Sequence, residues 1–569
     1  MTGAEGRWLR FFVLLLVTGG LVLPILTGLW ETGRAAFGIL PAIGAETWSL
    51  APWQRLFTLP GIGSSLKLSL WTGLASTLLA LLLATGFCAA IHGWSGQRHV
   101  SRILGPLLAA PHAALAIGIA FLIAPSGWIA RMISPWATGW NLPPNIATVN
   151  DQMGLALVLG LLVKEVPFLL LVMLGALGQI PVNAQLAAGR ALGYGRGVVW
   201  IKVILPQVYP LIRLPVFVVL SFALSVVDMA IILGPSNPPV LSVAVTRWYF
   251  AADTSLILPA SAAALAQAFV VAFGILLWIC AEQVAARAGR WWIRRGGRGY
   301  SAGPGLILAS GATLILMGLG ASALIDLAIW SVTWRWSFPS ALPEGWSSGI
   351  WARPGSGWGS AFIQTTVIGL TTTAIAVLLA IAWLEGEDRA GMQRARWAEV
   401  LIYLPLLVPQ IAFLYGLNVV FLRAGLTGGL GAVIWAQALF VFPYVMIALS
   451  DPWRALDRRL VCASAALGAG PMRRLVAVKL PILLRPLLTA AAIGFAVSVA
   501  QYLPTLFMGA GRVATLTTEA VTLSSGSDRR VTGVYAVLQA VLPLGTYVAA
   551  LFLPAFVHRN RRGLSGGAA

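Results

Sequence analysis

Charged side chains are scarce in this sequence: they make up 10% of its 569 residues, whereas soluble domains have about a quarter. Cysteine and histidine are scarce too, with three and four residues. The cysteines have no paired spacing and the histidines are scattered, which excludes a disulfide framework and predicts no metal site and no metalloenzyme. No Gly-x-x-x-x-Gly-Lys-Ser/Thr phosphate loop occurs, so any ATP hydrolysis must take place on another chain.

Apolar residues are abundant instead, at 59% of the chain with a mean hydropathy of +0.86. A helix that spans a membrane needs about 20 such residues, and runs of this length are too long for barrel strands. The sequence therefore predicts an all-α integral membrane protein with about twelve spans. We expect them at 11–30, 66–91, 103–124, 154–178, 212–233 and 258–282, and then at 304–330, 361–384, 399–422, 430–450, 487–508 and 533–557.

The net charge of +20 has a one-sided distribution. If the N-terminus is cytoplasmic, the inner loops carry 26 lysines and arginines and the outer loops 11, while Lys164 lies within a span. This excess obeys the positive-inside rule, so the charge reports topology and not nucleic-acid binding. The first run follows Arg7 and Arg10 and is too long for a typical signal peptide, so we interpret it as a retained span.

A short hydrophilic element occurs twice. Residues 187–206 and 462–481, shifted by 275 positions, are identical at eight of twenty places. Each copy has a glycine, Gly193 or Gly468, followed downstream by a Leu-Pro pair. We expect a short helix, a pivot at the glycine, and then the proline in the first turn of the next span, where its missing N–H costs nothing.

Weaker repeats indicate that the whole chain is duplicated. Residues 61–64 resemble 357–360, Pro111 and Gly118 match Pro409 and Gly416, and Pro167 matches Pro443. Six spans in each half make the halves parallel. We predict a first half at 1–284, a basic cytoplasmic linker at 285–302 and a second half at 303–569, with each repeated loop after the fourth span of its half.

These loops resemble the EAA loop, Glu-Ala-Ala-x-x-x-Gly followed by Leu-Pro, of the integral membrane permeases of binding-protein-dependent ABC importers. The family's glutamate falls on Ala187 and Cys462, which is a departure from the pattern in both copies. The fused layout is most similar to permeases of the iron(III)/thiamine/putrescine group. The resemblance covers roughly 55–285 and 350–560 and assigns the coupling positions to Ala188, Leu192, Gly193, Leu205, Pro206, Ala463, Leu467, Gly468, Leu480 and Pro481.

The resemblance implies a type I importer permease in a bacterial inner membrane, with both termini cytoplasmic. It implies coupling helices seated in a separate homodimeric ATPase, which would hold ATP-Mg, so this chain needs no cofactor. A periplasmic solute-binding protein would dock on the outer loops 31–65, 125–151 and 331–360, which are rich in tryptophan and glycine. Thiamine, ferric iron and polyamines all remain open as the transported solute.

Ionisable and polar groups within the spans are candidates for the translocation pathway. Glu165 lies in the fourth span, and the fifth spans contain Ser225-Val-Val-Asp228 and Ser498-Val-Ala-Gln501-Tyr502, which we match with each other. An acid in one half and an amide in the other favour a cationic solute. Glu165 could instead neutralise its neighbour Lys164, and Asp228 could hydrogen-bond between helices.

The alternative is a secondary carrier of the major-facilitator type, which also has two parallel six-span halves. Residues 386–394 (GEDRAGMQR) resemble that family's Asp-Arg-x-Gly loop, but the first-half loop 92–102 has no acid. Nothing in that family accounts for the paired Leu-Pro loops.

Overall fold

The computed structural model describes residues 2–92, 107–296, 303–391, 396–526 and 528–557. Within these residues ten helices are long and apolar enough to cross a membrane, and two bent pairs bring the number up to twelve. Each corresponds to one of the predicted runs, which confirms the all-α membrane fold. A two-stranded hairpin, β1 (Thr333–Arg335) and β2 (Gly345–Trp346), lies between α15 and α16.

The first half has six main segments. They are α1 (Thr2–Val17) with α2 (Leu23–Ala36), α4 (Ile62–Ile91), α6 (His112–Ile123), α8 (Leu155–Leu177), α11 (Leu205–Ser225) and α14 (Ile257–Arg294). Shorter helices connect them: α3 (Ala51–Thr58), α7 (Trp128–Ile133), α9 (Val182–Ala191), α10 (Arg196–Val199), α12 (Asp228–Leu233) and α13 (Leu241–Tyr249).

The second half repeats this order. Its main segments are α15 (Gly303–Ser331), α16 (Trp358–Arg389), α17 (Arg396–Leu407) with α18 (Gln410–Arg423), α19 (Leu430–Arg454), α23 (Leu484–Ala500) and α26 (Arg529–Val557). The shorter helices are α20 (Arg458–Ala466), α21 (Pro471–Arg474), α22 (Leu480–Ile482), α24 (Leu503–Gly509) and α25 (Leu516–Ser524).

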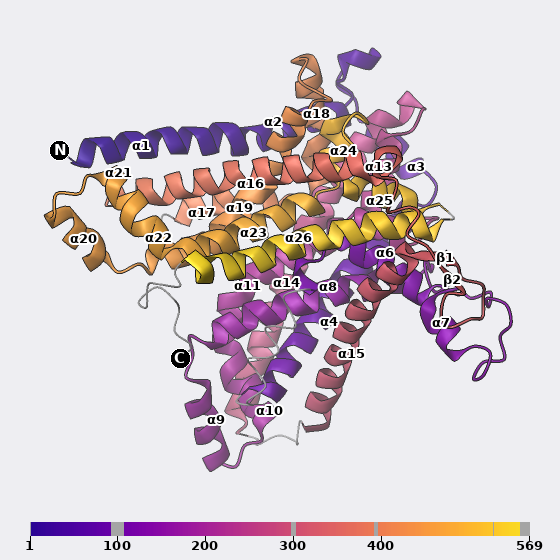
Figure 1. Ribbon diagram of the computed structural model, residues 1–569, viewed down its shortest axis with the longest axis horizontal. Helices are drawn as coiled ribbons and strands as arrows, with labels where there is room; N and C mark the ends of the chain where they lie inside the picture. The colour runs from indigo at the N-terminus through magenta and orange to yellow at the C-terminus, as the bar shows by residue number, and fades with distance from the viewer. Residues whose placement is uncertain (1, 93–106, 297–302, 392–395, 527, 558–569) are drawn as a thin grey trace.

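The helices form two bundles that diverge from a common end (Figure 1). One contains α1, α16, α19, α23 and α26, and the other contains α4, α8, α11, α14 and α15. The bundles meet near α6, α13, α24 and α25. The repeated loops lie at the two separated tips, with α9 and α10 at one and α20 to α22 at the other.

The first span of each half packs mainly against the opposite half, although α2 also contacts α14 and α15 also contacts α26. Helices α1 and α2 contact α16 and α18, and α15 contacts α4 and α6. Glycines make this packing between the halves possible, because a Cβ at Gly118 of α6 would lie 2.6 Å from the carbonyl oxygen of Ala323 on α15. At Gly416 of α18 it would lie 2.0 Å from the carbonyl oxygen of Gly28 on α2. The matched glycines of the sequence repeat are thus the sites where the two backbones approach each other closely.

Three expectations need correction. The span predicted at 399–422 is bent by 107° before Pro409, and the span in 103–124 is interrupted at 110–111, between a helical turn at 107–109 and α6, with 103–106 outside the described residues. Both fifth spans, predicted as continuous, are interrupted within the segments 226–227 and 501–502. Pro111 and Pro409 explain the breaks in the two third spans, because the residue before a proline avoids helical backbone angles.

The basic segment after the sixth span is also more regular than expected. Helix α14 continues to Arg294 without a break, while residues 297–302 lie outside the described part. Its 38 residues make a rod of about 57 Å, which exceeds the hydrocarbon thickness of about 30 Å. The helix therefore extends well beyond the membrane at the end that carries the first repeated loop.

We expect Gly118→Leu to lower the thermal unfolding midpoint of the purified protein, because a side chain there forces α6 away from α15. Overpacking of this kind costs about 1–3 kcal/mol. Gly318→Leu, on α15 at a position with no neighbouring atom within 4 Å, is the matched control and should leave the midpoint nearly unchanged. Equal midpoints for the two variants would contradict the close-packing role.

Candidate functional site

The two repeated loops have the same local structure up to the Leu-Pro pair, after which α11 continues without a break, while α22 is bent by 79° from α23. Helix α9 ends before Gly193, and α10 and a five-residue π-helical turn (Trp200–Ile204) lead into Leu205. Helix α20 ends before Gly468, and α21 and a second π turn (Leu475–Lys479) lead into Leu480. The two glycines have φ of +78° and +83°, a conformation in which other residues are strained. The sequence prediction of a glycine pivot is therefore confirmed.

Proline accounts for the π turn in each loop. Pro206 and Pro481 have no N–H, so each leaves a carbonyl of the preceding turn without its helical donor. The chain responds by widening: the N–H of Leu205 bonds to Trp200 O and that of Leu480 to Leu475 O, five residues back. Single widened turns of this kind often occur at functional sites.

The loop tips expose apolar side chains. Leu192 is 64% exposed and Leu467, at the equivalent position, is 89% exposed. Ala188, Ala463 and both pivot glycines are exposed as well, while Leu205, Leu480 and Pro481 are half-buried. Both tips lie beyond the main bundles (Figure 1). Exposed apolar residues on such projections are typical of docking surfaces.

The first loop is fastened to its bundle by apolar packing. Val198, Val199, Trp200 and Ile204 are all buried. The loop and the start of α11 are also joined to α14: Lys202 lies over the ring of Trp292 at 4.3 Å, and Arg213 pairs with Glu282 at 2.8 Å. This loop therefore rests on the inner extension of α14.

The interruptions of the fifth spans follow the same register as the loops. In the first half, α11 ends at Ser225 and α12 begins at Asp228. In the second half, α23 ends at Ala500 and α24 begins at Leu503, and both positions are shifted by 275. The sequence comparison matched Asp228 with Gln501, a shift of 273, and the structure corrects this. Asp228 corresponds to Leu503, and Gln501 corresponds to Val226.

Buried polar side chains hold both interruptions. Ser242 donates to Val226 O at 2.7 Å, and Thr517, shifted by 275, donates to Val499 O. From the sixth spans, Gln267 donates to Leu224 O at 2.9 Å, while Gln539 donates to the Thr517 hydroxyl at 2.7 Å. Sequence reasoning missed these four residues. Extending the 275-residue shift past the loops would have paired Ser242 with Thr517.

The structure brings some predicted pathway residues together and separates others. Asp228, 8% exposed, begins α12, and Tyr502 of the other half lies within electrostatic range of it. Gln501 precedes Tyr502 in the second interruption, and Ser225 ends α11, where its hydroxyl donates to Ser221 O at 2.7 Å. Ser498 donates instead to the amide oxygen of Gln437 on α19.

Glu165 lies apart from this group. It is buried in α8, with Ser76 of α4 within interaction range, in the interior of the first bundle. Its neighbour Lys164 does not pair with it: the Lys164 ammonium donates to the carbonyls of Leu108 and Ala110 at 2.8 and 2.5 Å. Lys164 thus satisfies the backbone of the interrupted third span.

A cavity of about 610 Å³ opens at the end of the molecule remote from the loops, near α7 and the hairpin. Its lining combines arginines with tryptophans: Ser126, Arg131, Trp330, Thr333, Trp334, Arg335, Trp336, Ser337, Asp528, Arg529 and Arg530. These come from the segment after α6, from the hairpin region, and from the start of α26. Both halves of the chain therefore build it.

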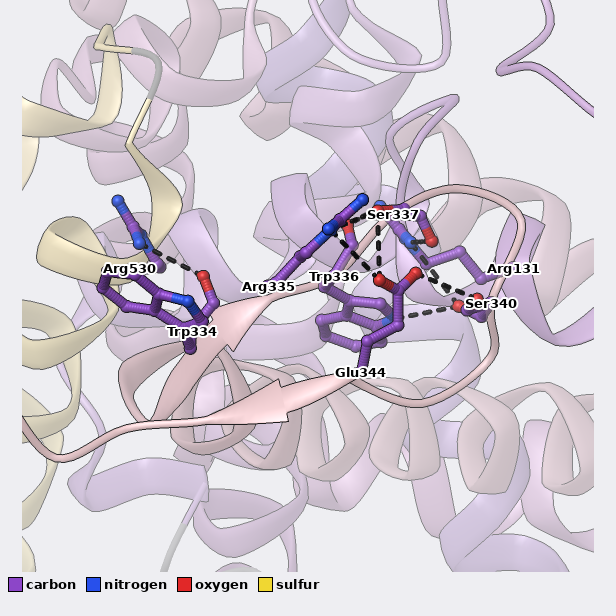
Figure 2. A network of polar contacts seen from close by, with 8 residues as sticks. All are labelled: Arg131, Trp334, Arg335, Trp336, Ser337, Ser340, Glu344 and Arg530. Carbon is purple, nitrogen blue, oxygen red and sulfur yellow. Dashed lines mark hydrogen bonds and ion pairs between the residues drawn. The ribbon is translucent and has the colours of Figure 1, made fainter.

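Hydrogen bonds to backbone carbonyls hold Arg131 and Arg530 in place (Figure 2). Arg131 donates to Ser337 O at 2.8 Å, and Arg530 donates to Trp334 O at 3.2 Å. Arg530 also pairs with Asp528 at 2.9 Å, and this hydrogen bond lowers the pKa of the Asp528 carboxyl below its usual value. Arg335 pairs in turn with Glu344 at 3.2 Å, just outside the lining. Four arginines against these two acids leave the cavity with a net positive charge.

The family of the chain follows from comparison with known proteins. Residues 388–562 match the family described as binding-protein-dependent transport system inner membrane component. The inner membrane ABC transporter permease protein YnjC of Escherichia coli is 32% identical over 519 residues, which cover 91% of this chain and 93% of YnjC. The chain belongs to this family of ABC transporter permeases. It is thus a transport subunit and not an enzyme.

Two relatives match part of the permease. PhnV of Salmonella typhimurium, named for 2-aminoethylphosphonate transport, is 24% identical over 175 residues, or 30% of this chain and 65% of PhnV. ModB of Mycobacterium tuberculosis, named for molybdenum transport, is 27% identical over 165 residues, or 27% of this chain and 62% of ModB. None of these names supports the major-facilitator alternative or a thiamine or iron specificity.

Proposed function

We propose that this permease is the whole transmembrane part of an ATP-driven importer, made of two fused halves at 1–284 and 303–569. Each half offers one coupling loop to a separate ATPase dimer, which would bind ATP-Mg, on the side of both chain termini. The observation that carries the proposal is the pair of exposed loops with one local structure at the tips of two bundles. A single such loop could be an ordinary interfacial helix, but two in register fit a two-fold partner.

The arrangement of the bundles suggests how transport is driven. The loops lie at separated tips while the opposite ends are packed together (Figure 1), as expected for a state open towards the cytoplasm. Closure of an ATPase dimer would draw the tips together and open the packed ends outward. ATP can shift this equilibrium only if the ATPase binds the two states differently, and the rigid loops supply the contacts for that difference.

The positive cavity is the place where we propose that the solute-binding protein docks. It is lined by the outer loops 125–151 and 331–360 together with Trp330 and the start of α26, and so joins both halves of the chain. Arginine and tryptophan are the residues enriched at the centres of protein interfaces. The partner surface should therefore present carboxylates, and the contact should weaken with salt.

The residues at the two interruptions of the fifth spans are the candidates for contact with the solute. Ser225 and Asp228 flank one interruption, Gln501 and Tyr502 lie in the other, and Tyr502 is within electrostatic range of Asp228. We propose that these residues contact the solute. One carboxylate among neutral partners suits a small polar solute with a positively charged group. Thiamine, polyamines, ferric iron and the amine of 2-aminoethylphosphonate all meet this description.

The loop proposal predicts that Gly193→Val combined with Gly468→Val abolishes ATP-coupled uptake and co-purification with the ATPase. Each substitution forces a β-branched residue into the left-handed region, at a cost of about 1–2 kcal/mol. Asparagine tolerates this conformation, so Gly193→Asn with Gly468→Asn is the matched control. The yield in the membrane fraction should be unchanged. Normal uptake by the valine double variant would refute the docking role.

The docking proposal predicts that Arg335→Glu with Arg530→Glu weakens the stimulation of ATP hydrolysis by the binding protein. We expect the concentration for half-maximal stimulation to rise about tenfold, because like charges then oppose each other. Arg353→Glu, an exposed outer arginine outside the cavity lining, controls for net charge. Stimulation that is unaffected by both the double variant and added salt would rule out this surface.

The pathway proposal predicts that Asp228→Asn lowers uptake by about tenfold while the complex with the ATPase still forms, because a desolvated cation loses its counter-charge. Labelled thiamine, putrescine, ferric iron and 2-aminoethylphosphonate are the solutes to compare. Glu165→Gln makes the same change inside the first bundle and should affect thermal stability more than uptake. The reverse result would move the solute site to Glu165.

A further inference from the structure

The second coupling loop has an unusual attachment to its bundle. Along its full length, Arg458–Ile482, the one buried side chain is that of Lys479, which is 4% exposed. At the position shifted by 275, the first loop has Ile204, which is fully buried. The first loop is thus held by fully buried apolar side chains, whereas the second has the partly buried Leu475 and Leu480 and one buried cation.

Lys479 binds the inner end of α16. Its ammonium lies 2.6 Å from Glu385 Oε2 and 2.6 Å from Asp388 Oδ2. Both acids are held by further partners, since Arg389 pairs with Glu385 Oε1 at 2.8 Å and the indole of Trp453 donates to Asp388 Oδ2 at 3.0 Å. The two carboxylates are therefore held in their orientation by groups other than Lys479.

A cationic side chain of the first loop also contacts the second span of its half. Arg196 donates to the carbonyl oxygens of Ala89 at 2.5 Å and of His92, at the end of α4. The matched segments 61–64 and 357–360 set a shift of 296 between α4 and α16. By that shift, Ala89 is equivalent to Glu385 and His92 is equivalent to Asp388.

Different groups thus make the same connection at the same two positions. Where α16 has carboxylates, the loop supplies a lysine. Where α4 has none, the loop supplies an arginine to the free carbonyls at the helix end, which carry partial negative charge. The two cations do not share a loop position, since Arg196 corresponds to Pro471 by the loop register.

We propose that Arg196 and Lys479 are positioning residues that link each coupling loop to the second span of its half, so that loop movement is passed to that helix. The inference rests on the proposed function of the loops. It further assigns unequal importance to the two links, because the first loop has apolar contacts and contacts to α14 as well. One of the two acids that receive the second link, Asp388, lies in the stretch 386–394 that resembles a carrier motif.

The test uses the permease with its ATPase in nanodiscs. Spin labels at Leu142→Cys and Leu426→Cys, exposed outer positions of the two halves, report the separation of the outer ends by electron paramagnetic resonance. The background replaces Cys280 and Cys462, which are exposed, with serine. Mg-ATP with vanadate is the probe, and Mg-ATP hydrolysis is measured in parallel.

We expect Lys479→Met to keep hydrolysis within about twofold but to lose the vanadate-induced change in label separation. Glu385→Gln should have the same effect, and combining the two should add nothing, because both remove one link. Arg196→Met should reduce the change only in part. Lys479→Arg should preserve it, and Arg485→Met, an exposed arginine just past the loop, should behave as the parent protein.

Three results would overturn the inference: a full label response in Lys479→Met, additive effects of Lys479→Met and Glu385→Gln, or equal losses in Arg485→Met. A variant that no longer forms the complex with the ATPase would also count against it, because the link would then hold the docking surface and not transmit its movement. Failure of the proposed function is distinguishable, since the parent protein itself would then neither bind the ATPase nor respond to vanadate.

Discussion

The structure of this permease depends on one constraint: a backbone group inside a membrane must find a hydrogen-bond partner within the protein. Regular helices meet it automatically, but the third and fifth spans are interrupted. At the third spans, Lys164 satisfies Leu108 and Ala110, and Ser221 of α11 donates to Leu407 O at 2.9 Å across the two halves. At the fifth spans, Ser242, Gln267, Thr517 and Gln539 perform the same task. A few buried polar side chains thus permit the irregular segments on which a pathway depends.

Duplication has preserved positions in this chain more faithfully than residue types. The second loop has Lys479 where the first has Ile204, and α16 has carboxylates where α4 has backbone carbonyls. The α13 and α25 hydroxyls are serine in one half and threonine in the other. Geometry is retained because each loop must reach a partner in the same way, whereas the chemistry of each contact is free to change as long as both sides change together.

Local patterns predicted much of this fold. The twelve apolar runs, the glycine pivots and the start of α11 at Pro206 all depend on neighbouring residues, and the structure confirms them. Pro481 is an exception, because it lies in the short helix α22, which is bent by 79° from the span α23. The interruptions of the fifth spans were missed because their stabilising donors lie on other helices, beyond any local pattern. The alignment that paired Asp228 with Gln501 differs by two residues from the structural register, because it matched similar polar residues and not the ends of the helices. The links of Arg196 and Lys479 were invisible for the same reason, since each joins segments about 90 to 110 residues apart.

Because the first span of each half packs mainly on the other half, the shape of the outer cavity depends on the angle between the two bundles. Since α1 and α2 pack on the second half and α15 packs on the first, the chain crosses between bundles in the segments 37–61 and 332–357, both at the outer end. The hairpin lies in the second crossing, and Arg530, at the start of α26, bonds to its Trp334 carbonyl. Helix α26 belongs to one bundle and α15 to the other (Figure 1). A change in the angle between the bundles must therefore alter the cavity, and a protein that fits the cavity in only one arrangement would bias that angle.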